Sequence, residues 1–269
     1  MANASLTLRY LGFCGVDDSI EPEILASLSR QYSWLEWGVL LRPDMEGKPR
    51  YATFEWIEKL STLKQNSSFP IQLAAHLCGR SCEELLEGNY TLLHKIDALG
   101  FARVQVNATK ANNVNYDTSN IAKVVDNICN GISQFPQIEF IIQTNQETLP
   151  IKSLIEARAS TLPNISFLYD SSCGTGVSID GNSIPVVHSQ IRCGYAGGIG
   201  PDTIHNILTL LSQTVPQGVP IWIDMESSLR EFVAKSKLDA EQGNFKDTFS
   251  INNCGKCLNI AKALCHFQS

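Results

Sequence analysis

The chain has 269 residues, of which 43% are hydrophobic, and a formal net charge of -6 at pH 7. This length can bury a sizeable core, either in one large α/β barrel or in two small domains. An acidic chain with a pI near 5.4 is poorly suited to a phosphate backbone or an anionic membrane, because either partner requires a basic patch. We therefore expect a small-molecule partner, and neither a nucleic acid nor a membrane.

The first twenty residues lack the basic segment and the apolar segment of a signal peptide. Their single basic residue is Arg9, and Asp17 and Asp18 follow it. No apolar run reaches the roughly 18 residues that cross a bilayer. Without an export signal, the nine cysteines are interpreted as reduced thiols, which predicts a cytoplasmic protein.

Short apolar runs rich in β-branched or aromatic residues recur along the chain and predict eight strands. They cover residues 6–13, 35–41, 71–77, 102–108, 138–144, 165–170, 190–195 and 219–225. Amphipathic helical patterns fill most of the intervals, for example at 54–63, 83–99, 119–133 and 203–212. Strands that alternate with helices imply a parallel sheet. Eight such units that close on themselves predict a single (β/α)8 TIM barrel domain over residues 1–269.

One interval, residues 171–189, has no helical pattern and is rich in Gly and Ser. Such an interval indicates an active-site loop or a surface excursion. No G-x-G-x-x-G follows the first strand, which weighs against an open dinucleotide-binding sheet.

In a barrel of this class, the chemistry gathers in the loops that follow the strands. Cys14 ends the first predicted strand, and it could act as a base if the polar mouth lowered its pKa. Asp170 ends the sixth strand, where a partly desolvated carboxyl group can serve as a general acid. Arg50 could hold a substrate carboxylate through two parallel hydrogen bonds. The alternatives are a buried hydrophobic thiol, a turn-capping carboxylate and a solvated arginine.

The seventh strand is followed by Gly197 and Gly198, just before a predicted helix that opens near Asp202. Small residues at a helix N-terminus expose backbone N–H groups, so this segment is a candidate phosphate cradle. A simple turn is the alternative.

Taken in chain order, these segments resemble the phosphoribosylanthranilate isomerase family. The matching segments are Phe13-Cys14-Gly15-Val16, Arg42-Pro43 with Lys48-Pro49-Arg50-Tyr51, Val104-Gln105, Asp170 with the loop after it, Gly197-Gly198-Ile199-Gly200-Pro201-Asp202, and Asp224-Met225-Glu226-Ser227-Ser228-Leu229. The similarity spans nearly the whole chain, although each motif is short.

The resemblance implies an Amadori isomerisation of N-(5-phosphoribosyl)anthranilate, in tryptophan biosynthesis, without metal or organic cofactor. It makes Asp170 the general acid and Cys14 the general base, with Arg50 on the substrate carboxylate. The remaining substrate-binding positions that it implies are Gln105, Gly197, Gly198, Asp224, Ser227 and Ser228. The substrate would be an anionic phosphosugar.

The sequence departs from the family at the eighth strand, where Glu226 is inserted into the phosphate loop and the glycine of that loop is missing. A carboxylate beside a phosphate repels it, so either Glu226 points outward, which we expect, or the natural ligand lacks a phosphate at this place. Gly12 replaces a basic residue of the family, and His76 and Cys78 have no assigned role.

Three other functions stay open. The first is a diverged isomerase or lyase acting on another sugar-type substrate through Cys14 and Asp170, because a fold does not determine a reaction. The second is a catalytically silent ligand-binding barrel. The third is metal binding by Cys254-x-x-Cys257 with Cys265 and His266, although residues 250–267 are more typical of a closing helix.

Overall fold

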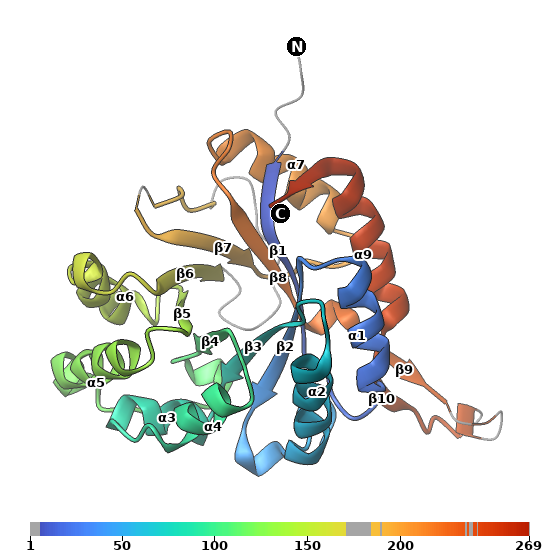
Figure 1. Cartoon of the computed structure of the whole chain (residues 1–269), viewed down its shortest axis with the longest axis horizontal. Helices are drawn as coiled ribbons and strands as arrows, with labels where there is room; N and C mark the ends of the chain where they lie inside the picture. Colours follow the sequence, from blue (N-terminus) through green and yellow to red (C-terminus); the bar gives the residue numbers. More distant parts are fainter. Residues whose placement is uncertain are drawn as a thin grey trace.

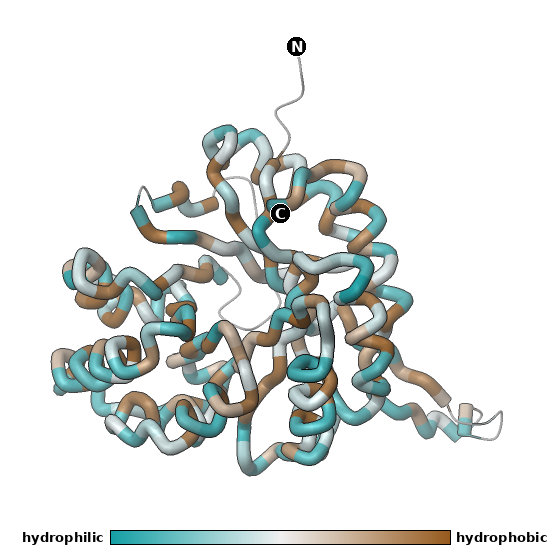
Figure 2. Tube along the Cα trace, viewed as in Figure 1, coloured by the Kyte–Doolittle hydropathy of each residue, from teal (hydrophilic) through white to brown (hydrophobic). Residues whose placement is uncertain are grey.

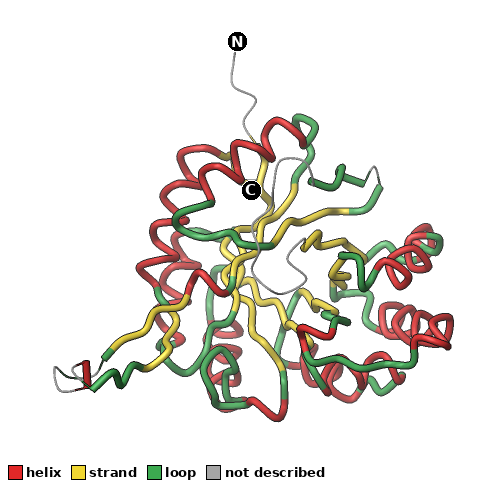
Figure 3. Tube along the Cα trace, turned by 180° about the vertical axis from the view of Figure 1, so that it is seen from behind, coloured by secondary structure: helices red, strands yellow, loops and turns green. Residues whose placement is uncertain are grey.

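The structure is a computed structural model that describes residues 6–170, 184–188, 190–234, 236, 239–240 and 242–268. Eight parallel strands form a closed barrel with helices around it (Figures 1 and 3). The strands are β1 Leu6–Cys14, β2 Leu35–Leu41, β3 Gln72–Leu77, β4 Arg103–Val106, β5 Glu139–Thr144, β6 Ile165–Asp170, β7 Arg192–Ala196 and β8 Ile221–Met225. Each neighbour in chain order is paired, and β8 pairs with β1 to close the barrel. The predicted TIM barrel fold is confirmed.

The helices of the described residues lie outside the strands (Figure 3). They are α1 Pro22–Gln31, α2 Phe54–Asn66, α3 Arg80–Glu87, α4 Thr91–Ala98, α5 Ile121–Gln134, α6 Leu149–Glu156, α7 Ile204–Thr214 and α9 Ile251–Leu264. Short 3-10 turns occur at η1 Pro43–Met45, η2 Lys110–Asn112, η3 Thr118–Asn120, η4 Ala159–Thr161 and η5 Ser227–Leu229. None of these helices is long and apolar enough to cross a membrane.

The helix predicted over residues 83–99 is wrong in one respect, because the chain forms two helices there. Gly88 ends α3 in the left-handed conformation with φ of 86°, which is the usual way for a glycine to terminate a helix. The structure also gives the bounds of α1 and α6, which lie in two intervals for which no helix range is stated above. Further along, α9 ends at Leu264, and Cys265–Phe267 forms the short strand β11 beside the start of β1.

The core has two parts, because each barrel strand is buried on both faces. One part lies between the strands and the helices, where the helices alternate between apolar and polar residues (Figure 2). The other part fills the barrel itself, where Ile141, Leu168 and Trp222 form an apolar cluster. Leu168 of this inner cluster also lines the cavity at the C-terminal ends of the strands.

A two-stranded hairpin, β9 Arg230–Val233 and β10 Lys246–Phe249, projects from the barrel after β8 (Figure 1). The buried side chain of Arg230 on β9 joins the base of the hairpin to the loop after β1 through an ion pair of 2.8 Å to Asp17. It forms a second ion pair of 2.8 Å with Asp247 on β10. This hairpin has no counterpart in the predicted pattern of strands.

Candidate active site

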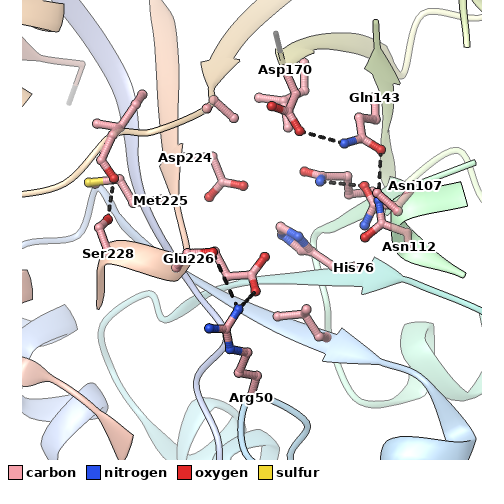
Figure 4. A pocket seen from close by; sticks show the side chains of 18 of the residues that line it. Arg50, His76, Asn107, Asn112, Gln143, Asp170, Asp224, Met225, Glu226 and Ser228 are labelled. Atoms are coloured by element: carbon pink, nitrogen blue, oxygen red, sulfur yellow. Dashed lines mark hydrogen bonds and ion pairs between the residues drawn. The ribbon is translucent and has the colours of Figure 1, made fainter. Parts of the chain in front are cut away.

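A cavity of about 340 Å³ opens at the C-terminal ends of the barrel strands, where TIM barrel enzymes place their catalytic groups. It is strongly polar (Figure 4). The described residues that line it are Leu40, Arg50, Tyr51, His76, Gln105, Asn107, Ala111, Asn112, Gln143, Leu168, Asp170, Ala196, Gly197, Gly198, Ile199, Asp224, Met225, Glu226, Ser227 and Ser228.

The floor of the cavity is a cluster of Cys14, His76 and Asp224, which come from β1, β3 and β8. Cys14 Sγ lies 2.7 Å from Asp224 Oδ1 and 3.4 Å from His76 Nε2. His76 and Asp224 line the cavity, whereas Cys14 is 2% exposed and lies behind them. These ligand-type atoms all lie within 4.8 Å of one another, so they can act as one unit.

Burial and mutual repulsion determine the charge of this cluster. Burial, reinforced by the carboxylate of Asp224, raises the pKa of Cys14 well above its usual value. Burial also raises the pKa of Asp224 to about 7, and it lowers the pKa of His76 to about 3, which keeps the imidazole neutral. A base at Cys14 needs a lowered pKa, and the burial of its thiol acts in the opposite direction.

Carboxamide side chains form a second wall of the cavity. Gln143 on β5 donates a hydrogen bond of 2.8 Å to Asp170 at the end of β6 and accepts one of 3.3 Å from Asn112. Beside them, Gln105 on β4 donates to Asn107 at 2.7 Å. Because the contact with Gln143 orients its carboxylate (Figure 4), Asp170 presents a defined hydrogen-bonding surface to the cavity.

The third wall carries Arg50 and Glu226, and here the predicted outward position of Glu226 is wrong. Glu226 lines the cavity, and its Oε1 lies 3.2 Å from Nη1 of Arg50 (Figure 4). Arg50 also approaches Ser227 Oγ at 3.5 Å and Asp247 at 3.8 Å. The guanidinium is thus neutralised by protein carboxylates, which leaves it poorly suited to clamp a substrate carboxylate.

The loops after β7 and β8 meet at the candidate phosphate cradle. Gly197 and Gly198 line the cavity with φ of 110° and 62°, a backbone region that favours glycine. The hydroxyl of Ser228 donates to the carbonyl of Ile199. Since a hydroxyl has one proton to donate, this contact leaves the hydroxyl of Ser228 no proton for a phosphate. Ser228 lines the cavity, and its role in binding phosphate stays a prediction.

The structure thus gathers Asp170, Asp224, Gln105, Arg50, Ser227, Ser228 and both glycines at one cavity, with Cys14 immediately beneath it. The Gly- and Ser-rich loop predicted at residues 171–189 lies outside the described residues, apart from residues 184–188.

His76 on β3 has no role predicted from the sequence, yet it lines the cavity. Because side chains alternate between the two faces of a strand, the sequence shows which residues of β3 share a face with His76. Which of the two faces lines the barrel interior is known only once the barrel has closed. Cys78 lies outside the lining, and its buried thiol contacts Asn112 at 3.6 Å. Cys254 and Cys257 lie buried in α9. Among the described residues, the group of side chains with metal-ligand spacing is Cys14, His76 and Asp224. Cys254 and Cys257 do not belong to it.

No family model matches the chain, and no curated protein matches it either. Among solved structures, it is similar to KGPDC from Streptococcus mutans, with 13% identity, a TM-score of 0.47, and coverage of 96% of this chain and 99% of that one. A mutant flavocytochrome b2 with pyruvate bound has 10% identity and a TM-score of 0.49, over 95% of this chain and 63% of that one. PhdJ bound to a substrate intermediate has 10% identity and a TM-score of 0.45, over 82% and 67%. At these identities the likeness concerns the barrel fold alone.

Proposed function

We propose that the protein is an enzyme, a diverged TIM barrel isomerase or lyase, and that its substrate is an uncharged sugar-type molecule. The observation that carries this proposal is the inward position of Glu226, which occupies Arg50. Among the described residues that line the cavity there are three carboxyl groups, Asp170, Asp224 and Glu226, and one guanidinium. Asp224 is only partly ionised near pH 7, but Asp170 and Glu226 still outnumber the guanidinium, and this excess of negative charge repels a phosphate or carboxylate.

The other lining groups support a substrate rich in hydroxyls. Each carboxamide offers both donors and an acceptor, and each carboxylate accepts, so together they match alcohol groups, which donate and accept. The cavity volume of about 340 Å³ lies at the small end of the range for ligand pockets, which is roughly 300–1,000 Å³. A monosaccharide or a small polyol is therefore the class of ligand that we expect.

Proton transfer is the chemistry that we assign to Asp170. A carboxylate held beside an open-chain sugar can remove the proton next to the carbonyl, which gives an enediolate, and the resulting carboxylic acid can return that proton to the former carbonyl carbon. A proton passes at the same time from the neighbouring hydroxyl to the former carbonyl oxygen. The carbonyl moves by one position, and no electron leaves the substrate. Loss of a hydroxyl as water from the same intermediate would give the lyase reaction instead.

The narrower function is the Amadori isomerisation of a phosphoribosyl amine, which the sequence resemblance favours. It is supported by the position of Cys14 and Asp170 at the same end of the barrel. Against it stand the inward Glu226, the engaged hydroxyl of Ser228 and the raised pKa of Cys14. The uncharged substrate is therefore the function that we propose.

Matched pairs of sugars test the proposal. Binding of ribose and of ribose 5-phosphate would be compared by calorimetry, and carbon-bound deuterium would be followed by NMR after incubation of a panel of aldoses and ketoses in D₂O. We expect the uncharged sugar to bind more tightly and to exchange a proton in the wild type but not in Asp170→Asn. Tighter binding of the phosphorylated sugar would contradict the proposal and favour the Amadori reaction. Binding without exchange by any sugar would indicate a silent ligand-binding barrel.

A further inference from the structure

We propose that Cys14, His76 and Asp224 bind one divalent transition-metal ion, zinc by the chemistry of its ligands, at the floor of the cavity. The three side chains come from β1, β3 and β8, and the ligand atoms are Sγ, Nε2 and a carboxylate oxygen. This site was not foreseen from the sequence, where the one metal alternative was the cysteine pair near the C-terminus.

One pair of these atoms already has the spacing of a tetrahedral zinc site, and all three lie within 4.8 Å of one another. With Zn–S near 2.3 Å and Zn–N near 2.0 Å, two ligand atoms of such a site lie roughly 3.5 Å apart. The distance from Cys14 Sγ to His76 Nε2 is 3.4 Å. Cys14 Sγ and Asp224 Oδ1, now 2.7 Å apart, would separate by roughly an ångström as their shared proton is replaced by the ion.

Two glycines keep space open around the three ligands. A Cβ atom at Gly38 would lie 2.3 Å from Cys14 Sγ and 2.9 Å from His76 Nε2, and a Cβ atom at Gly12 would lie 2.5 Å from Asp224 Oδ1. The interior of a TIM barrel is ordinarily filled by bulky branched side chains. The glycines on the neighbouring strands β1 and β2 therefore leave a space beside the three ligands, a glycine cradle that a larger side chain at either position would fill.

The composition of the ligand set selects the ion. A thiolate and an imidazole favour zinc, whereas magnesium and calcium prefer oxygen ligands throughout. Three protein ligands leave a fourth position, the pattern of catalytic rather than structural zinc. Because His76 and Asp224 line the cavity, that position faces the space where the substrate would lie. The metal would polarise a substrate oxygen there, while Asp170 remains available on the opposite wall for proton transfer.

Metal content tests this site without any knowledge of the substrate, so its failure is distinct from failure of the proposed function. The full chain would be stripped with a chelator and dialysed against a small excess of zinc, and bound zinc would then be measured by mass spectrometry. We expect about one zinc per chain in the wild type, and at least a tenfold lower affinity in Cys14→Ser and Asp224→Asn. Cys129→Ser, which changes a thiol outside the cluster, should bind as the wild type does.

Gly38→Ala provides a sharper variant, because it keeps all three ligands and fills the cradle. We expect it to lose zinc as well, with circular dichroism and thermal melting showing that the barrel is folded. Cobalt offers a second readout: the wild type should show the thiolate-to-cobalt charge-transfer absorption, and Cys14→Ser should not. Absence of bound zinc in the wild type, or equal zinc and cobalt binding by wild type and Cys14→Ser, would overturn the assignment.

Discussion

Arg50 and Glu226 form an ion pair at the wall of the cavity, with 3.2 Å between Nη1 and Oε1, although 176 residues separate them in the chain. The backbone N–H of Arg50 donates to Asp17 at 2.6 Å, and its φ of 77° is unusual for a residue other than glycine. The conformation of the loop after β2 thus holds the guanidinium against the β8 loop. This pair decides which charges a ligand would meet.

Removal of the charge on Glu226 should therefore change the preference for anions. We expect Glu226→Gln to bind inorganic phosphate or ribose 5-phosphate at least about fivefold more tightly than the wild type, because a like charge is lost and Arg50 is released. Calorimetric titration at low ionic strength would measure this change. Glu58→Gln, an exposed substitution on α2, is the matched control for net charge. Unchanged phosphate affinity in Glu226→Gln would show that this carboxylate does not exclude anions.

Asp170→Asn should leave the fold intact, because an asparagine can still accept the hydrogen bond that Gln143 donates over 2.8 Å. Proton transfer needs the ionisable group itself, and a general acid or base contributes about 10²-fold or more. We expect deuterium exchange into the responsive sugar to fall by at least that factor, with an unchanged melting temperature as evidence of folding. Exchange within threefold of the wild type would remove Asp170 from the mechanism.

Cys14 should be chemically inert in the metal-free protein. Its 2% exposure and raised pKa both act against alkylation, since the thiolate is the reactive form. We expect iodoacetamide at pH 8 to label Cys129, which is partly exposed, at least about 100-fold faster than Cys14. Peptide mass spectrometry over a time course would measure both rates. Comparable labelling of the two thiols in the folded protein would contradict the burial of Cys14.

At the opposite end of the barrel interior, Glu139 should contribute stability that depends on pH. Burial alone would raise its pKa, but Arg103, Arg9 and Arg192 outweigh that effect and lower the pKa to about 2. A carboxyl with a lowered pKa stabilises the fold above its unfolded pKa near 4.5 and loses that contribution as the pH falls toward 2. Since a tenfold change in proton affinity corresponds to about 1.4 kcal/mol, the contribution at pH 7 is about 3 kcal/mol.

We therefore expect Glu139→Gln to lower the free energy of unfolding by about 3 kcal/mol at pH 7 and by roughly half of that at pH 3. Urea titrations at both pH values would measure the two differences, with Glu58→Gln as the exposed control. A loss of stability in Glu139→Gln that is equal at pH 7 and pH 3 would show that the effect arises from packing and not from charge.

The barrel itself could be predicted from the sequence, because strands buried on both faces appear as continuous apolar runs and the helices between them keep an amphipathic period. The predicted run 35–41 coincides with β2, and 165–170 coincides with β6. Both signals are local, so they can be recognised without knowing which strands and helices pack against each other. The apolar period continues through Gly88, so it predicts one helix, although Gly88 ends α3 in the left-handed conformation.

The candidate residues at the strand ends were also accessible, because in parallel strands all C-terminal ends meet at one face. That rule places Asp170 and Gly198 at the cavity without any contact being known. It does not give the direction of a side chain in a loop, and so Glu226 was expected to point outward. Its position follows from the ion pair with Arg50, a contact between two loops that no local pattern records.

The floor cluster belongs wholly to the tertiary structure. Gly12 on β1 lies opposite Asp224 on β8, and Gly38 on β2 lies opposite Cys14, in registers that exist only because the barrel closes. In the sequence these residues are an isolated thiol, an imidazole, a carboxylate and two glycines, each ordinary for its strand. When the barrel closes in this register, Cys14 Sγ and Asp224 Oδ1 lie 2.7 Å apart, although 210 residues separate them in the chain. The register depends on long-range hydrogen bonds and packing, which no local run of residues determines.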